Sequence, residues 1–437
     1  MVNMSYRILS LGNAWAANTV NTGIFRHHAI FTHKQFQFSA FYENSQTIKL
    51  VQRNLSTSEV IFSEINGVFN IKDAHNIISL GIDRKEYLHI VYDHHISVLR
   101  YRKSKLPLDI HEWTDESGMS GKFENNITYP TFMIPANHPL LMLYRDGRWN
   151  AGSARIKEYD EETDTWIDRE NAILSGRNNS PWTSNAYWNH PAIAQNGDLH
   201  LSFTWRVDYS NEEKRINNIN IDYAYSQDAG KSWLTSKNRP LRLPITQVNS
   251  ETIFAISPDS NLMNQCSMAL DSKNHPHIVF YSDGPRGIPQ YQHLWFTGKV
   301  WKHRYISQRK KTFILSGAGT LDVPISRPEI VIDKNDIAYV IYRGDLTCNK
   351  LVSQRLLPPL YLPNHDDYIV LWNQSVDSSE PVIDRIRWQR DNILTMYIQK
   401  TKQTDNEGFI GESYNDCYLV DWNLPSLYNN TLLDNDS

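Results

Sequence analysis

The feature that most constrains the fold of this chain is a module that recurs seven times. Each copy has a short apolar strand, a polar turn and a second strand that ends in aromatic residues. The copies span residues 29–42, 78–93, 130–146, 191–206, 267–283, 328–345 and 383–400. Strand-only repeats with a period of about 40–50 residues are typical of a β-propeller, and longer spacings predict insertions in loops. We predict an all-β fold, a seven-bladed β-propeller.

Burial of apolar surface explains why such modules assemble into a ring. A four-stranded sheet has two apolar faces that it cannot bury alone, and radial packing of blades covers both faces and protects the strand edges. We therefore expect one propeller domain over residues 1–437, in which the first and last segments complete a shared blade. About ten residues at the C-terminus are expected to form a disordered tail.

A second motif supports the propeller. The sequence Ser-Gln-Asp-Ala-Gly-Lys-Ser-Trp at residues 226–233 matches an Asp-box, and residues 159–166 form a degenerate copy. In this motif the aspartate caps backbone amides of a hairpin turn and the tryptophan packs beneath it. Its role is structural, so it identifies no chemistry by itself.

Composition excludes several classes of protein. A formal charge of −4 argues against a general binder of nucleic acid or of membrane surfaces, because such binders need a basic excess. No apolar run approaches the roughly 20 residues of a membrane span. Met1 to Asn18 shows no signal peptide. Cys266, Cys348 and Cys417 are odd in number and far apart, which predicts three buried thiols.

Residues 75–145 hold the groups with the greatest chemical potential. His75 lies in a loop, the pair His94-His95 follows a strand, Tyr129 precedes a proline and Arg145 ends an apolar strand. Each has an ordinary structural explanation, but all fall where blades meet one mouth. Because successive strand side chains point to opposite faces, only one of His94 and His95 can enter a central site. We expect His95 to do so, with His94 supporting it or packed.

Several arginines occupy equivalent strand ends. Arg206 and Arg343 match the position of Arg145, and Arg327 is a fourth candidate. Guanidinium groups bind carboxylates in bidentate geometry, so these arginines predict a cationic cup for an acidic sugar, with Tyr144 beside it. No zinc-ligand spacing, Walker loop, dinucleotide fingerprint or Gly-x-Ser-x-Gly elbow occurs in the sequence.

Taken together, these elements resemble a known family. The chain is similar to the BNR-repeat propellers that include polysaccharide lyases cleaving the L-rhamnose-α-1,4-D-glucuronate bond, both ulvan lyases and exo-acting lyases of gum arabic. The matching elements are Gly-Asn-Ala-Trp-Ala-Ala-Asn at 12–18, Asp-His-His at 93–95, Thr-Tyr-Pro at 128–130, Leu-Tyr-Arg-Asp-Gly at 143–147, Gln-Tyr-Gln-His-Leu-Trp at 290–295 and Arg-Pro at 327–328.

The resemblance implies a catalytic set of His75, His95, Tyr129 and Arg145. His75 and His95 are 20 residues apart, and Tyr129 and Arg145 are 16 apart, as in the family. The ulvan branch carries a His/Cys zinc site just after the arginine, whereas residues 146–159 contain neither residue type. This departure favours exo action on rhamnose-capped glucuronate of gum arabic, with an endo-acting ulvan lyase as the alternative. The resemblance implies no cofactor for the chemistry and a structural calcium ion in the central channel.

The implied reaction is β-elimination from an acidic polysaccharide, and the substrate class favours a secreted or periplasmic location. Arg145 would neutralise the uronate carboxylate, His95 or Tyr129 would remove the C5 proton, and Tyr129 or His75 would protonate the leaving oxygen. A sialidase is one alternative, disfavoured because Phe-Arg-His at residues 25–27 replaces the Arg-Ile-Pro element. A non-catalytic sugar-binding propeller is the other, for which the 13 tryptophans would supply stacking platforms.

Overall fold

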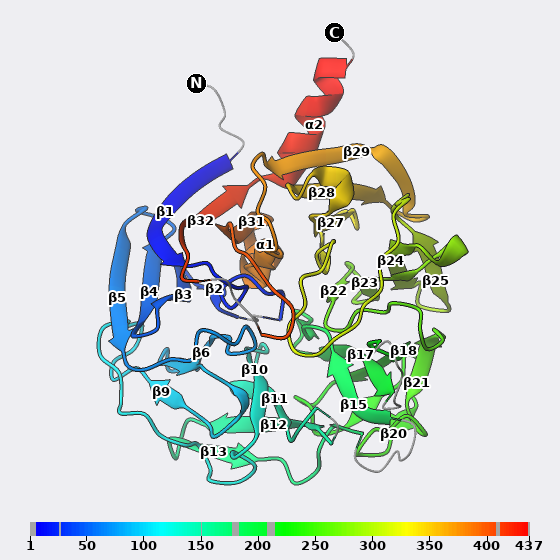
Figure 1. Ribbon diagram of the computed structural model, residues 1–437. Helices are drawn as coiled ribbons and strands as arrows, with labels where there is room; N and C mark the ends of the chain where they lie inside the picture. The colour runs from blue at the N-terminus through cyan, green and yellow to red at the C-terminus, as the bar shows by residue number, and fades with distance from the viewer. Residues whose placement is uncertain are drawn as a thin grey trace.

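The computed structural model describes residues 6–25, 28–149, 151–176, 183–207, 215–407 and 411–435. Over these residues the strands form seven antiparallel sheets that follow one another around a central axis in chain order (Figure 1). The all-β propeller predicted from the repeated modules is therefore confirmed. No helix among the described residues is long and apolar enough to cross a membrane.

The first four sheets contain the N-terminal half of the chain. The first has β2 (Ile30–His33), β3 (Phe36–Asn44), β4 (Thr47–Asn54) and β5 (Val60–Asn66), and the second has β6 (Ser79–Ile82), β7 (Leu88–Val91) and β9 (Tyr101–Lys103). The third has β8 (His95–Ser97), β10 (Ile127–Met133), β11 (Leu141–Asp146), β12 (Ser153–Asp160), β13 (Thr165–Asp168) and β14 (Leu174–Ser175). The fourth has β15 (Thr183–Trp188), β16 (Ala192–Ile193), β17 (Leu199–Val207), β18 (Asn218–Ser226), β19 (Trp233–Leu234), β20 (Pro240–Leu241) and β21 (Glu251–Phe254).

The remaining sheets have four strands each. They are β22 (Ser267–Leu270), β23 (Pro276–Asp283), β24 (Pro289–Phe296) and β25 (Trp301–Tyr305), then β26 (Glu329–Ile332), β27 (Ala338–Tyr342), β28 (Leu351–Leu357) and β29 (Leu362–Trp372), and finally β30 (Val382–Ile383), β31 (Leu394–Gln399), β32 (Tyr414–Trp422) and β1 (Tyr6–Trp15). The helices are α1 (Arg385–Asp391), α2 (Leu424–Asn435) and the short 3-10 turns η1 (Pro285–Gly287) and η2 (Asp345–Thr347).

The expectation of seven four-stranded blades is wrong. Among the described residues, six sheets have four or more strands and form complete blades, whereas the sheet of β6, β7 and β9 has three. The chain after β9 returns beside it but makes only two isolated bridges, Tyr101 to Ser117 and Ser104 to Trp113. Those two bridges are too few for a fourth strand. β8, which follows β7 in the chain, joins β10 of the next sheet instead.

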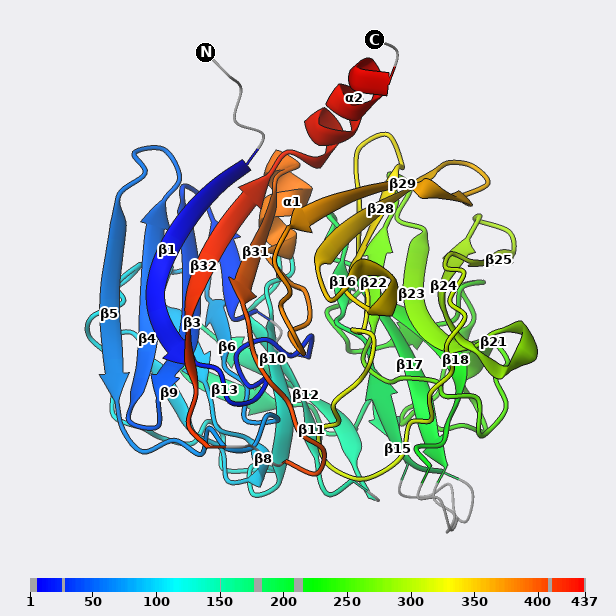
Figure 2. The ribbon, with the colours of Figure 1, turned by 45° about the horizontal axis from the view of Figure 1, so that its top comes forward.

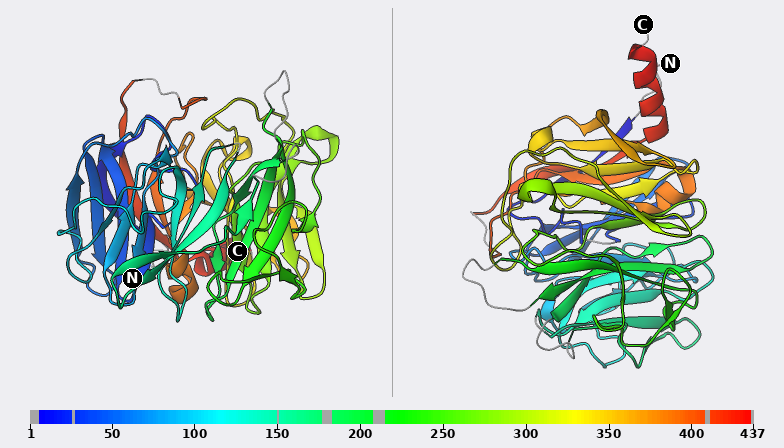
Figure 3. Two further views of the ribbon diagram at one scale, coloured as in Figure 1. Left: turned by 90° about the horizontal axis from the view of Figure 1, so that it is seen from below. Right: turned by 90° about the vertical axis from the view of Figure 1, so that its right-hand side faces the viewer.

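The ring is closed by its first and last strands, as expected. β1 pairs with β32 in an antiparallel register that runs from Tyr6 opposite Trp422 to Trp15 opposite Tyr414 (Figure 2). The disordered tail stays a prediction; among the described residues, α2 projects from the body as a helix (Figure 3). Its first turns are anchored by the buried side chains of Leu424 and Tyr428, which pack in a core cluster with β31 and β32.

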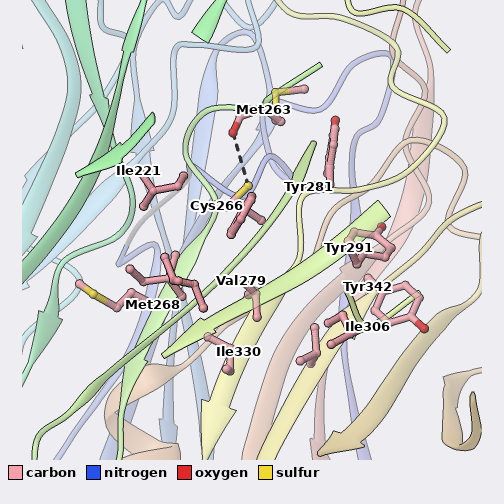
Figure 4. Packing of buried hydrophobic residues seen from close by; sticks show 14 of the residues in the cluster. Ile221, Met263, Cys266, Met268, Val279, Tyr281, Tyr291, Ile306, Ile330 and Tyr342 are labelled. Atoms are coloured by element: carbon pink, nitrogen blue, oxygen red, sulfur yellow. Dashed lines mark hydrogen bonds between the residues drawn. The ribbon is translucent and has the colours of Figure 1, made fainter. Parts of the chain in front are cut away.

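Apolar side chains pack between neighbouring sheets, as radial packing requires. Figure 4 shows the cluster around β22 to β24, where Cys266 lies against Met263 among buried isoleucine and tyrosine side chains. Cys266 and Cys417 are buried thiols, whereas Cys348 is exposed, which corrects the prediction of three buried cysteines. Cys348 follows η2 in the turn that leads to β28, where nothing covers it.

The Asp-box has the structural role predicted for it. Asp228 accepts hydrogen bonds from the backbone and hydroxyl of Ser232, and Ser226 accepts one from the amide of Gly230. Trp233 is buried beneath this turn and donates to the Gly230 carbonyl at 3.2 Å. The motif therefore fixes the hairpin between β18 and β19, away from the residues discussed below.

Candidate active site

The register of three adjacent strands places the first candidate residues together. Thr128 of β10 lies opposite His95 of β8 on one side and opposite Arg145 of β11 on the other. The register shifts between Thr128 and Thr131, and Tyr129 occupies this irregularity with a φ of 55°. A bulge of this kind re-aims a side chain, and a left-handed backbone is uncommon for a bulky residue. Tyr129 lies close to His75 and Arg145.

Strand alternation decides which residue of the Tyr144-Arg145 pair reaches the site. Leu141 and Leu143 of β11 share one face and one core cluster, while Met142 and Tyr144 pack in another. Arg145 continues the face of Leu141 and Leu143, since side chains of a strand alternate. Tyr144 therefore points to the opposite side, and its predicted contact with substrate is corrected.

A cavity of about 710 Å³ lies where these residues meet. Its lining includes all four residues of the expected catalytic set and two of the other arginines. The lining residues used below are Phe25, His75, His95, Tyr129, Arg145, Trp149, Tyr187, Arg206, Arg215, Gly319, Thr320 and Arg327. β10 leads from this cavity toward a second cavity of about 300 Å³ beside α1. Ile134, the residue after β10, lines the second cavity.

The two histidines form a stacked pair bound by carboxylates. Their ring centroids are 4.0 Å apart with an interplanar angle of 17°. Asp73 accepts two hydrogen bonds, from His75 Nδ1 to Oδ1 at 2.9 Å and from His95 Nδ1 to Oδ2 at 2.6 Å. Glu407 approaches His75 Nδ1 at 2.7 Å from the opposite end of the chain. His75 is 8% exposed, whereas the His95 side chain is 25% exposed.

This network changes the protonation of both partners. Burial lowers the pKa of His75, but Tyr129 and the hydrogen bonds to Asp73 and Glu407 outweigh burial and raise it well above its ordinary value. Burial raises the pKa of Asp73, but the hydrogen bonds from His75 and His95 dominate and hold it far below its usual range. His75 is therefore an imidazolium near neutral pH, and Asp73 is a carboxylate.

Cations and aromatic rings surround the phenol of Tyr129. The Arg145 guanidinium carbon lies 5.1 Å from the Tyr129 ring centroid, and the His75 ring lies 5.7 Å from it. Arg145 is 2% exposed, and among the described residues its Nε is buried without a hydrogen-bond partner. A buried donor without a partner is costly, so the Arg145 Nε is available to a ligand with an acceptor atom.

Tyr187 is a cavity residue that the sequence analysis did not identify. Its ring lies 4.6 Å from the guanidinium carbon of Arg206 and 5.9 Å from that of Arg145. Burial raises the pKa of Tyr187, but Arg206, Arg145 and His75 outweigh burial and lower it to about 8. Its position in the sequence could have identified it. Tyr187 lies four residues before the fourth module, just as Tyr129 lies directly before the third module.

The other predicted binding residues divide into two groups. Arg206 lines the cavity and donates to the amide oxygens of Asn218 and Asn264. Arg327 also lines it, but its charge is offset by a bidentate ion pair with buried Glu380. Of the arginines in the predicted cup, Arg145, Arg206 and Arg327 line the cavity.

His94 and Arg343 do not line the cavity, which corrects both predictions of substrate contact. His94 is fully buried between Ser97 and the backbone of Arg100, so it is the packed member of the pair, and burial lowers its pKa to about 4. Arg343 donates to the backbone carbonyls of Val323, Ser378 and Ser379. It thereby links the connection before β26 to the connection before β30.

One group of described residues could gather around a metal ion. Ligand atoms of Asp73, His75, His95 and Glu407 lie within 4.8 Å of one another. Calcium takes six to eight oxygen ligands, so two imidazoles and two carboxylates do not suit it. The contacts of 2.6–2.9 Å between nitrogen and oxygen are hydrogen-bond lengths, shorter than the ligand separations around a tetrahedral zinc. We therefore assign protons, not a metal, to these contacts.

The central axis does not suit calcium either. Its narrow part holds a cavity of about 10 Å³, and its lining includes the polar residues His28, His190, Glu329 and Arg385. Glu329 is the one carboxylate of that lining and is paired with Arg385 at 2.5 Å. No step of the chemistry below is routed through a metal ion.

Fold and site together define a β-propeller whose cavity is lined by arginine, histidine and tyrosine side chains. The family model described as "BNR repeat-containing family member" matches residues 36–309. The chain belongs to this family, as the resemblance in the sequence predicted.

Relatives with assigned activities are ulvan lyases. The long isoform of an ulvan lyase from Pseudoalteromonas sp. (strain PLSV) is 26% identical over 208 residues, which cover 44% of this chain and 19% of that protein. The corresponding enzyme of Alteromonas sp. (strain LOR) is 30% identical over 208 residues, again 44% of this chain and 19% of the relative. The chain thus spans about a fifth of the length of these relatives.

Solved structures show the same fold. The polysaccharide lyase Uly1 superposes with a TM-score of 0.69 at 14% identity, over 96% of this chain and 99% of that one. An ulvan lyase bound to -[GlcA(1-4)Rha3S]- superposes with a TM-score of 0.62 at 14% identity, over 80% of this chain and 83% of the other.

Proposed function

We propose that this protein is a polysaccharide lyase that cleaves a rhamnose–glucuronate linkage by β-elimination. One observation carries the proposal: a buried guanidinium whose Nε has no hydrogen-bond partner among the described residues, a phenol and two imidazoles line one cavity. Elimination next to a carboxylate needs a cation to stabilise the enolate-like charge and groups that move protons. The cavity supplies each of them.

Arg145 is the group that would bind the uronate carboxylate. Its guanidinium is buried, faces the cavity and has an Nε without a hydrogen-bond partner among the described residues. A carboxylate would complete a bidentate, charge-assisted pair with it. Such pairing lowers the pKa of the C5 proton because the charge that develops on its removal is already balanced.

The proton transfers fall to Tyr129, His95 and His75. In glucuronate the C5 proton and the C4 oxygen lie on the same side, so a syn elimination can use groups on one face. His75, held as an imidazolium by Asp73 and Glu407, is suited to protonate the departing oxygen. His95 or Tyr129 then removes the C5 proton, since both line the same cavity.

Ulvan is the substrate that the named relatives favour over gum arabic. Both sequence relatives described above are ulvan lyases, and a solved propeller of this fold holds a sulfated glucuronate–rhamnose repeat. The arginines Arg206 and Arg215 in the lining offer positive charge beyond Arg145 for a second anionic group. The sequence-based preference for gum arabic rested on residues 146–159, which contain no histidine or cysteine.

Exo action is a second proposal, favoured by a strap that crosses the cavity. Residues 315–323 follow the fifth sheet in the chain, accept a backbone hydrogen bond from Ile216 at the Leu315 carbonyl, and reach Glu407 through the amide of Thr320 at 2.6 Å. Gly319 and Thr320 of the strap line the cavity. A cavity walled on one side accommodates a chain end better than the middle of a polymer.

The test is the product profile on ulvan and on gum arabic. Elimination leaves a double bond in the uronate, which absorbs in the ultraviolet, and the size of the products distinguishes exo from endo action. Tyr129→Phe and His95→Ala should each lower the rate by about a hundredfold or more, because each removes a group that moves a proton. Sugar released without the unsaturated product would reject elimination.

A further inference from the structure

Two acidic residues outside the expected catalytic set hold the histidines in place. We infer that Asp73 and Glu407 are positioning residues that fix the orientation, the stacking and the charge of His75 and His95. Glu407 also makes the site depend on closure of the propeller ring. This inference rests on the proposed function only for its kinetic test, because the geometry can be measured without substrate.

Asp73 orients both imidazole rings through their Nδ1 atoms. A carboxylate has no proton to donate, so the Nδ1 atoms of His75 and His95 must donate to it. Asp73 is itself oriented by the turn, since its Oδ1 also accepts the backbone amide of His75 at 2.9 Å. With both Nδ1 atoms occupied, the Nε2 atoms of the pair are the nitrogens left for chemistry in the cavity.

Glu407 provides the second negative charge from the far end of the sequence. It lies in the connection between β31 and β32 of the sheet that β1 completes. Its Oε1 accepts the amide of Thr320 and lies 2.7 Å from His75 Nδ1, and its Oε2 accepts the amide of Ala74 at 3.2 Å. Two segments far apart in the sequence, residues 74–75 and the strap, thus converge on one carboxylate.

The close approach of the strap depends on Gly319. Its φ is +66°, and a Cβ there would lie 2.7 Å from Glu407 Oε1. A side chain at this position is excluded by backbone conformation and by contact at once. The glycine therefore lets the strap pass close enough for Thr320 to bind Glu407.

Charge balance explains why two carboxylates are needed. Parallel imidazole rings at 4.0 Å repel strongly if both are protonated, and the charged groups of the cavity include Arg145 and Arg206. The titratable groups facing His75 among the described residues include Asp73, Glu407, His95, Tyr129 and Tyr187. Without Glu407, Asp73 would have to balance both rings alone, and His75 would lose its proton at lower pH.

The decisive variant is Glu407→Gln, with Glu412→Gln as the matched control. Gln keeps the shape and an acceptor oxygen but removes the charge, and Glu412 is an exposed glutamate on the same connection. Nitrogen-15 NMR of the imidazoles, without substrate, should show His75 losing its proton at lower pH in Glu407→Gln. The control should match the wild type.

Kinetics provide the second readout. Loss of a carboxylate that orients a histidine typically lowers activity by about 10–100-fold. We expect this loss in kcat of Glu407→Gln, with KM changed less than about twofold and the alkaline limb of the pH profile shifted to lower pH. Asp73→Asn should lower kcat further, because it releases both rings. A merely structural role would lower thermal stability without moving the pH profile.

The outcomes separate the two proposals. If the wild type shows no lyase activity but the imidazole titration moves in Glu407→Gln, the function is wrong and the positioning role stands. If the titration of His75 is the same in wild type and variant, the inference is overturned whatever the activity. Stoichiometric zinc bound by the wild type and lost in Asp73→Asn would also overturn it, since a metal would then hold the rings.

Discussion

Replacement of Arg145 by methionine should separate activity from stability. The side chain is 2% exposed, and its Nε has no hydrogen-bond partner among the described residues. Two unit charges about 4 Å apart attract by about 4 kcal/mol at an effective dielectric constant of about 20. Each 1.36 kcal/mol of barrier changes a rate about tenfold, so Arg145→Met should lower kcat/KM by about a thousandfold.

Thermal unfolding of the same variant should show no loss. Removing a buried charge that lacks a partner is neutral or stabilising, and methionine fills a similar volume. We therefore expect the Tm to stay equal or to rise, while Arg145→Lys, which keeps the charge but loses the planar fork, falls between wild type and methionine in activity. Arg148→Met is the control, an exposed arginine three residues on. Activity within tenfold of wild type in Arg145→Met would refute the assignment of the carboxylate site.

Three further predictions concern other residues of the cavity. Tyr187→Phe should abolish a tyrosinate absorbance change near pH 8. The pKa of Tyr187 lies below the value of about 10 in the unfolded chain. The stability of the wild type relative to the variant should therefore rise from about pH 8 to 10. Trp149, 51% exposed on the cavity rim, should stack on a sugar ring, so Trp149→Ala should raise KM on polymer by about tenfold with kcat little changed, and an equal KM would exclude stacking. Gly319→Ala should lower activity at least tenfold by displacing Glu407, and wild-type activity would show that the strap yields freely.

The modules predicted the mouth of the propeller better than they predicted the number of complete blades. Six cavity residues lie within four positions before the start of six successive modules, and Glu380, which pairs with Arg327, does so before the seventh. The six are Phe25, His75, Tyr129, Tyr187, Gln265 and Arg327. The residues just before the module starts therefore come together at one end of the axis, where the cavity lies. This rule would have found Tyr187.

Other features depended on information that a local pattern does not contain. Alternation along β11 separates Tyr144 from Arg145, but which face turns inward is set by packing against the neighbouring sheets. The contact of Glu407 with His75 joins residues more than 300 positions apart and requires the ring to close. The chain beside β9 forms two isolated bridges in place of a fourth strand. The strand propensities of its residues do not distinguish these two cases.

The backbone at Tyr129 shows how the surrounding sheet maintains a site that local preference opposes. A positive φ costs a bulky residue about 1–3 kcal/mol, and Pro130 restricts the preceding residue further. Hydrogen-bonded neighbours on both sides of Thr128 hold the bulge in place, and Phe25 packs edge-on against the phenol at 5.5 Å. Strain and an unpaired guanidinium occur together on two adjacent strands of one sheet. A bound substrate can supply a hydrogen-bond partner for the buried Nε of Arg145. The cavity is therefore better explained by catalysis than by stability.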